Sequence, residues 1–146
     1  EFAASAQLMQ MSEDLFSKLT KIQPTMFDPK TDIVAAGTTA EFWNDTDTVK
    51  HNYAQGLAAY LTYLESFHGS CGAGAGKYTS SGVTVGECNL FASLSILTLI
   101  KPDCLNAYPA VKAFFDTFGA LPATKGVLET GSQMPGPFAQ YFMTHE

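Results

Sequence analysis

The chain has 146 residues, about the size of one domain, and its 46% hydrophobic content is enough for a single core. Fourteen acidic residues outnumber eight basic ones, which are all lysines, and the net charge is -6. A chain without arginine lacks the planar donors that suit bidentate contacts with phosphate or guanine, and its charge repels polyanions. The composition therefore argues against a nucleic-acid partner.

The spacing of the cysteines and the length of the apolar runs indicate in which cell compartment the protein is found. The cysteines are odd in number and too widely spaced for a CxxC pair, which favours a reducing cytoplasm: Cys71, Cys88 and Cys104. The longest apolar run, residues 90–100, is shorter than the roughly 20 residues that a membrane span needs. No signal peptide is visible either. We therefore expect a cytoplasmic protein without a membrane segment.

Two amphipathic helices are predicted in the first half of the chain. Near the start, apolar residues recur three and four positions apart, which places them on one helix face: Leu8, Met11, Leu15, Leu19 and Ile22. Pro24 ends this helix. The same spacing predicts a second, longer helix over residues 42–67, with Gly69 in the usual C-terminal position.

Three further helices are predicted after a Gly- and Ser-rich loop at residues 69–82. The first covers residues 85–100, is apolar on nearly all sides and ends before Pro102. The second begins at Pro109 and ends at Gly119, because proline suits the first position of a helix and glycine its end. A short third helix begins at Pro122 and ends at Gly131.

The C-terminal tail, "SQMPGPFAQYFMTHE", has two prolines and no helical run, so we expect it to lie extended across the surface. No stretch alternates apolar and polar residues as a half-buried strand would. The sequence therefore predicts an all-α helical bundle that forms one domain over residues 1–146.

Two motifs compete in the stretch "GSCGAGAGKYTSSGVTVGEC". A phosphate-binding loop needs the pattern GxxxxGK[ST] after a strand. Here Cys71 replaces the first glycine, Tyr78 replaces the final Ser or Thr, and a helix precedes the loop, so a flexible connector is the favoured interpretation. In the second half, Thr84 and Glu87 have the spacing of a capping box that starts the next helix.

Metal and nucleophile motifs are absent from the sequence. His68 and Cys71 offer two ligand types, but the other histidines, His51 and His145, lie far from them in the chain, so we expect no metal. No GxSxG pattern exists, since His68 stands where that pattern would need a glycine before Ser70.

Residues 83–131, "VTVGECNLFASLSILTLIKPDCLNAYPAVKAFFDTFGALPATKGVLETG", resemble the C-terminal helical domain of cytosolic glutathione transferases, most closely the pi, mu, alpha and sigma classes. The likeness includes the capping box and the segments Tyr108–Phe114 and Leu121–Lys125. Two positions depart from the family pattern: Glu87 stands where Asp is usual, and Ser80 stands where Gly is usual.

The resemblance implies the helical half of a dimeric detoxification enzyme that conjugates glutathione, its co-substrate, to hydrophobic electrophiles without a cofactor. In that family an N-terminal thioredoxin-like domain binds glutathione and supplies a Tyr or Ser hydroxyl, and this domain is not in residues 1–146. We therefore expect the full-length protein to be active and residues 1–146 alone to be inactive. The alternative is a non-catalytic assembly or ligand-binding module, as in elongation-factor gamma or synthetase complexes.

The resemblance also assigns candidate site residues. "SEDLFSKL" matches the family motif whose acid reaches across the dimer to glutathione, so Asp14 takes that role, whereas composition alone would make Glu13 and Asp14 a solvated face. The family lines its electrophile pocket at positions that correspond to Ser17, Lys21, Pro24 and Phe138. For Phe138, packing on the bundle remains the alternative.

Overall fold

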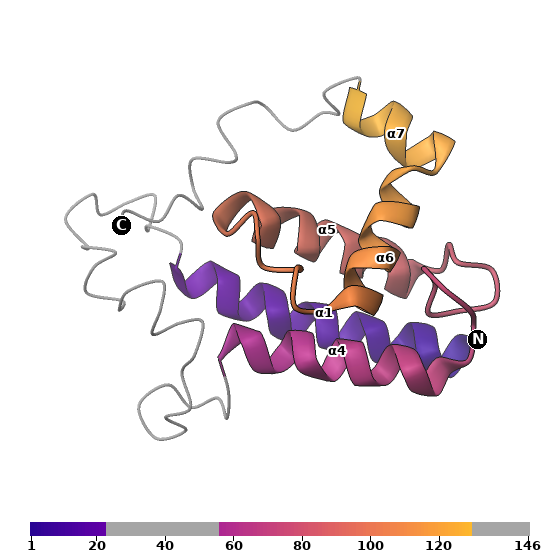
Figure 1. Cartoon of the computed structure of the whole chain (residues 1–146), viewed down its shortest axis with the longest axis horizontal. Helices are drawn as coiled ribbons and strands as arrows, with labels where there is room; N and C mark the ends of the chain where they lie inside the picture. Colours follow the sequence, from indigo (N-terminus) through magenta and orange to yellow (C-terminus); the bar gives the residue numbers. More distant parts are fainter. Residues whose placement is uncertain (23–55, 130–146) are drawn as a thin grey trace.

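The computed structural model describes residues 1–22 and 56–129, which form only helices and loops. The helices are α1 (Phe2–Ile22), α4 (Leu57–Cys71), α5 (Val85–Ile100), α6 (Pro109–Gly119) and α7 (Pro122–Glu129). In Figure 1, α1 and α4 run side by side, and α5 lies against the other side of α1. Helix α6 contacts both α5 and α4, and α7 follows α6 at the top of the view. The predicted all-α bundle is confirmed for the described residues.

Helix α1 turns one narrow face toward the bundle. The buried residues of this face are three and four positions apart: Ser5, Leu8, Ser12 and Leu15. Its two serines permit close contact with α5, because the Gly86 amide donates to Ser5 Oγ at 3.0 Å and Ser93 Oγ donates to the Ser12 carbonyl at 3.4 Å. A Cβ atom at Gly86 would overlap the Ser5 carbonyl oxygen. The α1–α5 contact therefore depends on small residues on both helices.

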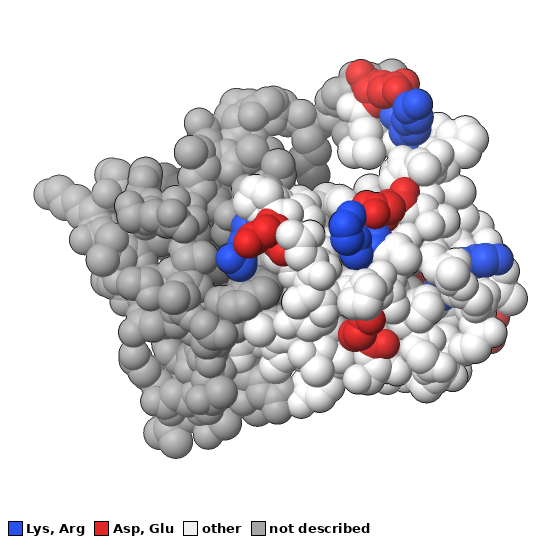
Figure 2. Space-filling model, viewed as in Figure 1, with Lys and Arg blue, Asp and Glu red and all other residues white. Residues whose placement is uncertain are grey.

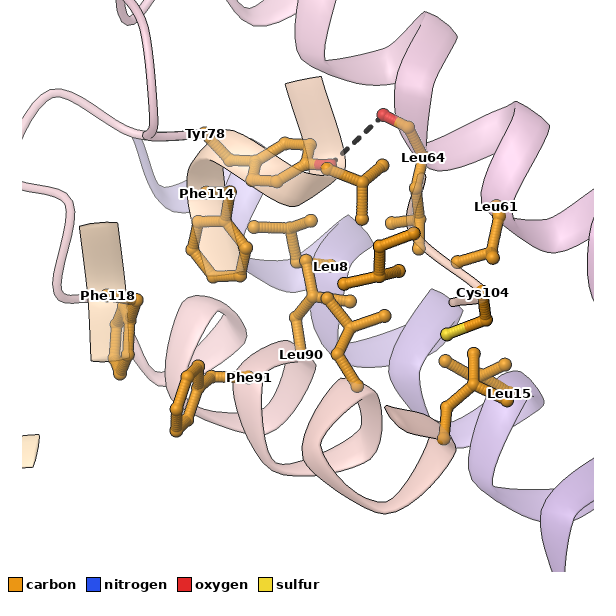
Figure 3. Packing of buried hydrophobic residues seen from close by; sticks show 14 of the residues in the cluster. Leu8, Leu15, Leu61, Leu64, Tyr78, Leu90, Phe91, Cys104, Phe114 and Phe118 are labelled. Carbon is orange, nitrogen blue, oxygen red and sulfur yellow. Dashed lines mark hydrogen bonds between the residues drawn. The ribbon is translucent and has the colours of Figure 1, made fainter. Parts of the chain in front are cut away.

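The core lies where α1, α4, α5 and α6 meet (Figure 3). Leucines from the first three helices fill its centre: Leu8, Leu15, Leu57, Leu61, Leu64, Leu90, Leu94 and Leu97. Aromatic rings close it on the α6 side, where Phe91 stacks on Phe118 with ring centroids 5.0 Å apart. The described bundle thus has one continuous apolar core.

Helix α6 is tied to α4 at its first turn. The Glu65 carboxylate of α4 accepts hydrogen bonds from the Ala110 and Val111 amides at 3.0 Å. The Tyr108 hydroxyl, just before Pro109, donates to the Ala58 carbonyl at 3.0 Å. Because the amides of a first helical turn have no partner within their own helix, Glu65 acts as a cap supplied by another helix.

One predicted boundary is wrong. Helix α4 continues through Gly69 and ends at Cys71, and Gly72 is the residue in the left-handed conformation, with φ 63°. A glycine ends a helix when it adopts positive φ, and here Gly72 does so. The predicted segments 42–55 and 130–146 lie outside the described residues, as does Gly131.

Candidate functional site

Glu87 is the centre of a buried polar network at the start of α5. Its side chain is 0% exposed, and its carboxylate accepts hydrogen bonds from five donors on three residues, Tyr78, Thr79 and Thr84. Thr84 Oγ1 in turn accepts from the Glu87 amide, so α5 begins with a capping box. Burial alone would raise the pKa of Glu87, but the hydrogen bonds outweigh burial and lower it.

This network extends beyond the capping pair to the preceding loop. Glu87 Oε1 accepts from the Tyr78 and Thr79 amides at 2.9 and 3.0 Å, and Oε2 accepts from Thr79 Oγ1 at 2.6 Å. Thr79 Oγ1 also accepts from the Gly82 amide at 3.2 Å. One carboxylate therefore joins the loop at residues 72–82 to the first turn of α5.

The glycines of this loop are needed for its backbone conformation and its packing on the bundle. This finding corrects the interpretation of the loop as a flexible connector. Four of them have positive φ: Gly72, Gly74, Gly76 and Gly82. Gly76 also packs against α6, where an added Cβ would overlap Thr117 Oγ1 and lie 3.2 Å from the Ala113 carbonyl oxygen. The Lys77 side chain lies along Gly82, since a Cβ there would be 3.0 Å from Lys77 Cδ. The loop is therefore docked on the bundle.

Tyr78 anchors the same loop to the core. It is 1% exposed, and its hydroxyl donates to the Leu64 carbonyl at 3.2 Å (Figure 3). Its ring meets those of His68 and Phe114 edge-on, both with centroids 5.1 Å away. Burial raises the pKa of the Tyr78 hydroxyl far above its ordinary value. The hydroxyl therefore stays protonated and acts as a structural donor.

The candidate residues on α1 share the face that points away from the core. Asp14 is half-buried and Ser17 is exposed, three positions apart and opposite the buried Leu8 and Leu15. Lys21 continues the same face by its position in α1, but its side chain lies outside the described residues. Pro24 and Phe138 lie outside them altogether. The structure thus places Asp14 and Ser17 on one face of α1 and does not test the binding role of any of the five residues.

Two amides hold the acidic pair of α1. Gln10 Nε2 donates to Asp14 Oδ1 at 3.2 Å within α1, whereas Asn89 Nδ2 of α5 donates to Glu13 Oε1 at 3.3 Å. The sequence analysis overlooked both amides. The spacing of four between Gln10 and Asp14 is a signal that could have found the first contact. No local pattern could have found the second, because its partners are far apart in the chain.

The described residues contain no group of three or more His, Cys, Asp or Glu side chains placed to hold a metal ion. His68 Nε2 is buried without a hydrogen-bond partner, and its ring packs on Tyr78. Burial raises the pKa of the Cys71 thiol, which lies one turn further along α4, and the nearby Glu87 charge raises it further. A thiol with a raised pKa is a poor nucleophile and a poor metal ligand.

On the face shown in Figure 2 the described residues carry few charges, and several lysines lie beside acids. Three ion pairs in the described residues are Lys101–Asp103, Lys112–Asp116 and Lys125–Glu129. Among residues 1–22 and 56–129, no helix combines the length and apolar character needed to cross a bilayer.

Three large apolar side chains are exposed at the end of the bundle where α1 and α5 begin. Phe2 is 88% exposed, Val83 is 55% exposed and Val85 is 67% exposed, and we call these residues the end patch. The two helix starts lie close together, because the Ser81 amide donates to Glu1 Oε1 at 2.9 Å. Contiguous exposed apolar surface marks interaction sites in proteins, and these three side chains share one end of the bundle.

Residues 32–131 match a family model described as "Glutathione S-transferase, C-terminal domain". No curated protein and no solved structure matches the chain. The matched range contains α4, α5, α6 and α7 with their capping box and Pro-started helices. It does not contain α1 or Phe138, so the family match supports the scaffold more directly than the candidate site on α1.

Proposed function

Because the chain belongs to the glutathione S-transferase C-terminal domain family, we propose that it is the helical domain of an enzyme that conjugates glutathione to hydrophobic electrophiles. The family match over residues 32–131 is the observation that carries this proposal. The enzyme would be a cytoplasmic homodimer of the pi, mu, alpha or sigma type, with a role in detoxification.

The proposal divides the work between two domains. Conjugation requires a thiol with a lowered pKa and an electrophile held beside the thiolate. Two groups in the core, the Cys104 thiol and the Tyr78 hydroxyl, are unsuited to stabilising a thiolate, because both are buried and burial raises their pKa. We assign the stabilisation of the thiolate to a thioredoxin-like domain that precedes Glu1 in the full-length protein, and the holding of the second substrate to the helical domain.

The end patch supports this arrangement. A domain that precedes Glu1 would join the bundle at the start of α1, where Phe2, Val83 and Val85 are exposed. Burying apolar surface favours association by about 25 cal/mol for each Å² removed from water. The thioredoxin-like domain would cover this end of the bundle and leave the outward face of α1 beside its glutathione.

Asp14 is proposed to bind the ammonium group of glutathione across the dimer. A carboxylate that meets an ammonium forms a charge-assisted hydrogen bond, which suits the recognition of a zwitterionic peptide. Ser17, Lys21 and Pro24 would continue along the electrophile pocket, and Phe138 would close it. The half-buried position of Asp14 on the outward face of α1 supports this role.

The test uses the full-length protein that contains residues 1–146. We expect the full-length protein to conjugate glutathione to an aryl chloride, which is measured by the absorbance of the conjugate. Residues 1–146 alone should show no turnover. A full-length protein that neither binds glutathione nor turns over would contradict the proposal and favour a non-catalytic assembly module. Turnover by residues 1–146 alone would contradict the division of work between the domains.

A further inference from the structure

We propose that Gln10 is a positioning residue that holds the Asp14 carboxylate in the orientation that receives the glutathione ammonium. This inference rests on the proposed function and deepens it. The two residues lie one helical turn apart on α1, and their side chains meet at 3.2 Å between Gln10 Nε2 and Asp14 Oδ1. The direction of the hydrogen bond is unambiguous, because an ionised carboxylate only accepts.

The hydrogen bond engages one oxygen of Asp14. With Oδ1 held by the Gln10 amide, the carboxylate still offers further acceptor sites to an incoming ammonium group. A carboxylate on a free rotor would lose its conformational freedom when the ligand binds, whereas a carboxylate already held by Gln10 loses less. Gln10 thus contributes to glutathione affinity without touching glutathione.

A second amide contacts the neighbouring acid in the same way. Asn89 of α5 donates to Glu13 Oε1 at 3.3 Å, and Glu13 is exposed. The two adjacent acids therefore have different partners. Asp14 accepts from an amide of its own helix, and Glu13 accepts from an amide of α5. Asn89 offers a matched control, since its removal breaks an amide–carboxylate contact of the same kind on the acid that does not receive the ligand.

Two substitutions of Gln10 test the inference in the full-length enzyme. Gln10→Leu removes the donor and is expected to raise the KM for glutathione about twofold at unchanged kcat, in line with exposed side-chain pairs on helices. Gln10→Lys places an ammonium one turn from Asp14, where it competes with the ligand, and is expected to raise KM about twofold to fivefold. Added salt should reduce the second effect and leave the first unchanged.

A double-mutant cycle shows whether Gln10 acts through Asp14. In an Asp14→Asn background, neither Gln10→Leu nor Gln10→Lys should raise KM further, because the carboxylate that Gln10 orients, and for which a new ammonium would compete with the ligand, is no longer present. Asn89→Ala should leave the KM for glutathione unchanged. The melting temperature of each variant, measured by circular dichroism, separates these effects from a loss of folding.

The outcomes distinguish this inference from the proposed function. If Asp14→Asn raises KM while both Gln10 variants leave it unchanged, the positioning role is wrong and the enzyme assignment stands. The same conclusion follows if Gln10→Lys raises KM equally in both backgrounds. If an active enzyme does not respond to Asp14→Asn, the Asp14 assignment and this inference both fail. A full-length protein that neither binds glutathione nor turns over would overturn the proposed function itself.

Discussion

The loop at residues 72–82 and the outward face of α1 use acidic side chains in opposite ways. Glu87 is fully buried and accepts from five donors, so its position is fixed by the surrounding backbone. Asp14 is half-buried and accepts from the Gln10 side chain at 3.2 Å. Glu87 is therefore part of the scaffold, whereas Asp14 can bind a ligand with little effect on the fold.

The largest difference should appear when the buried acid is removed. Glu87→Ala leaves the Tyr78, Thr79 and Thr84 amides without their acceptor, and each unsatisfied buried donor destabilises by about 1–3 kcal/mol. We expect the free energy of unfolding to fall by about 4 kcal/mol in urea titrations. Glu129→Ala, which removes an exposed glutamate at the end of α7, is the control and should change it by less than about 0.5 kcal/mol. Equal losses in the two variants would contradict the scaffold role of Glu87.

Acid should weaken the same network. Because the folded pKa of Glu87 is lowered, its contribution is fully present above the ordinary pKa, about 4.3 for a glutamate. The contribution is lost as the pH falls from there through the folded pKa. We expect Glu87→Gln to reduce the slope of stability against pH below about pH 4.3. An unchanged slope in urea titrations across that range would show that other carboxylates govern acid unfolding.

A smaller loss is expected at Gly76. Both Gly76 and Gly74 have positive φ, so alanine strains the backbone at either position by roughly 1–2 kcal/mol. Only at Gly76 would the new methyl group also overlap α6, at Thr117. We expect Gly76→Ala to lower the free energy of unfolding by about 3 kcal/mol, and Gly74→Ala by about 1 kcal/mol. In a Thr117→Ala background, the difference between the losses of the two glycine variants should become smaller. Equal losses for Gly76→Ala and Gly74→Ala in the otherwise unchanged protein would mean that the loop is not docked on α6.

Stability should respond least at Asp14, where the effect on ligand binding is expected instead. Asp14→Asn removes a charge but keeps a side-chain oxygen that can accept from Gln10 Nε2, and it should change the free energy of unfolding by less than about 0.5 kcal/mol. In the full-length enzyme it should raise the KM for glutathione about threefold to fivefold, which is the size of an exposed ion pair. A stability loss comparable to that of Glu87→Ala would place Asp14 in the scaffold instead.

Signals within a few residues were enough to predict much of the helical scaffold. The capping pair Thr84–Glu87 correctly predicts the start of α5, and Pro109 and Pro122 correctly predict the starts of α6 and α7. These signals work because proline and the capping box act on the backbone next to them. The end of α4 was missed because Gly69 and Gly72 satisfy the same local rule. Only Gly72 adopts positive φ, whereas Gly69 stays helical, and their local sequence does not distinguish them.

The candidate site was less accessible to sequence reasoning. Periodicity places Asp14 and Ser17 on the outward face of α1, but the role of Asp14 stays a prediction from family resemblance. Burial of Tyr78 could not be foreseen, because a Gly- and Ser-rich stretch normally indicates an exposed loop. The contact between Asn89 and Glu13 depends on how α1 and α5 pack, so it appears only in three dimensions.

The burial of Tyr78 gives the protein a natural optical reporter. Burial raises the pKa of the Tyr78 phenol far above the ordinary value for a tyrosine, about 10. Its phenolate would form only after the ring leaves its contacts with Phe114 and the Leu64 carbonyl. A late step in the ultraviolet difference spectrum would therefore record the detachment of the loop from the bundle, without any added dye.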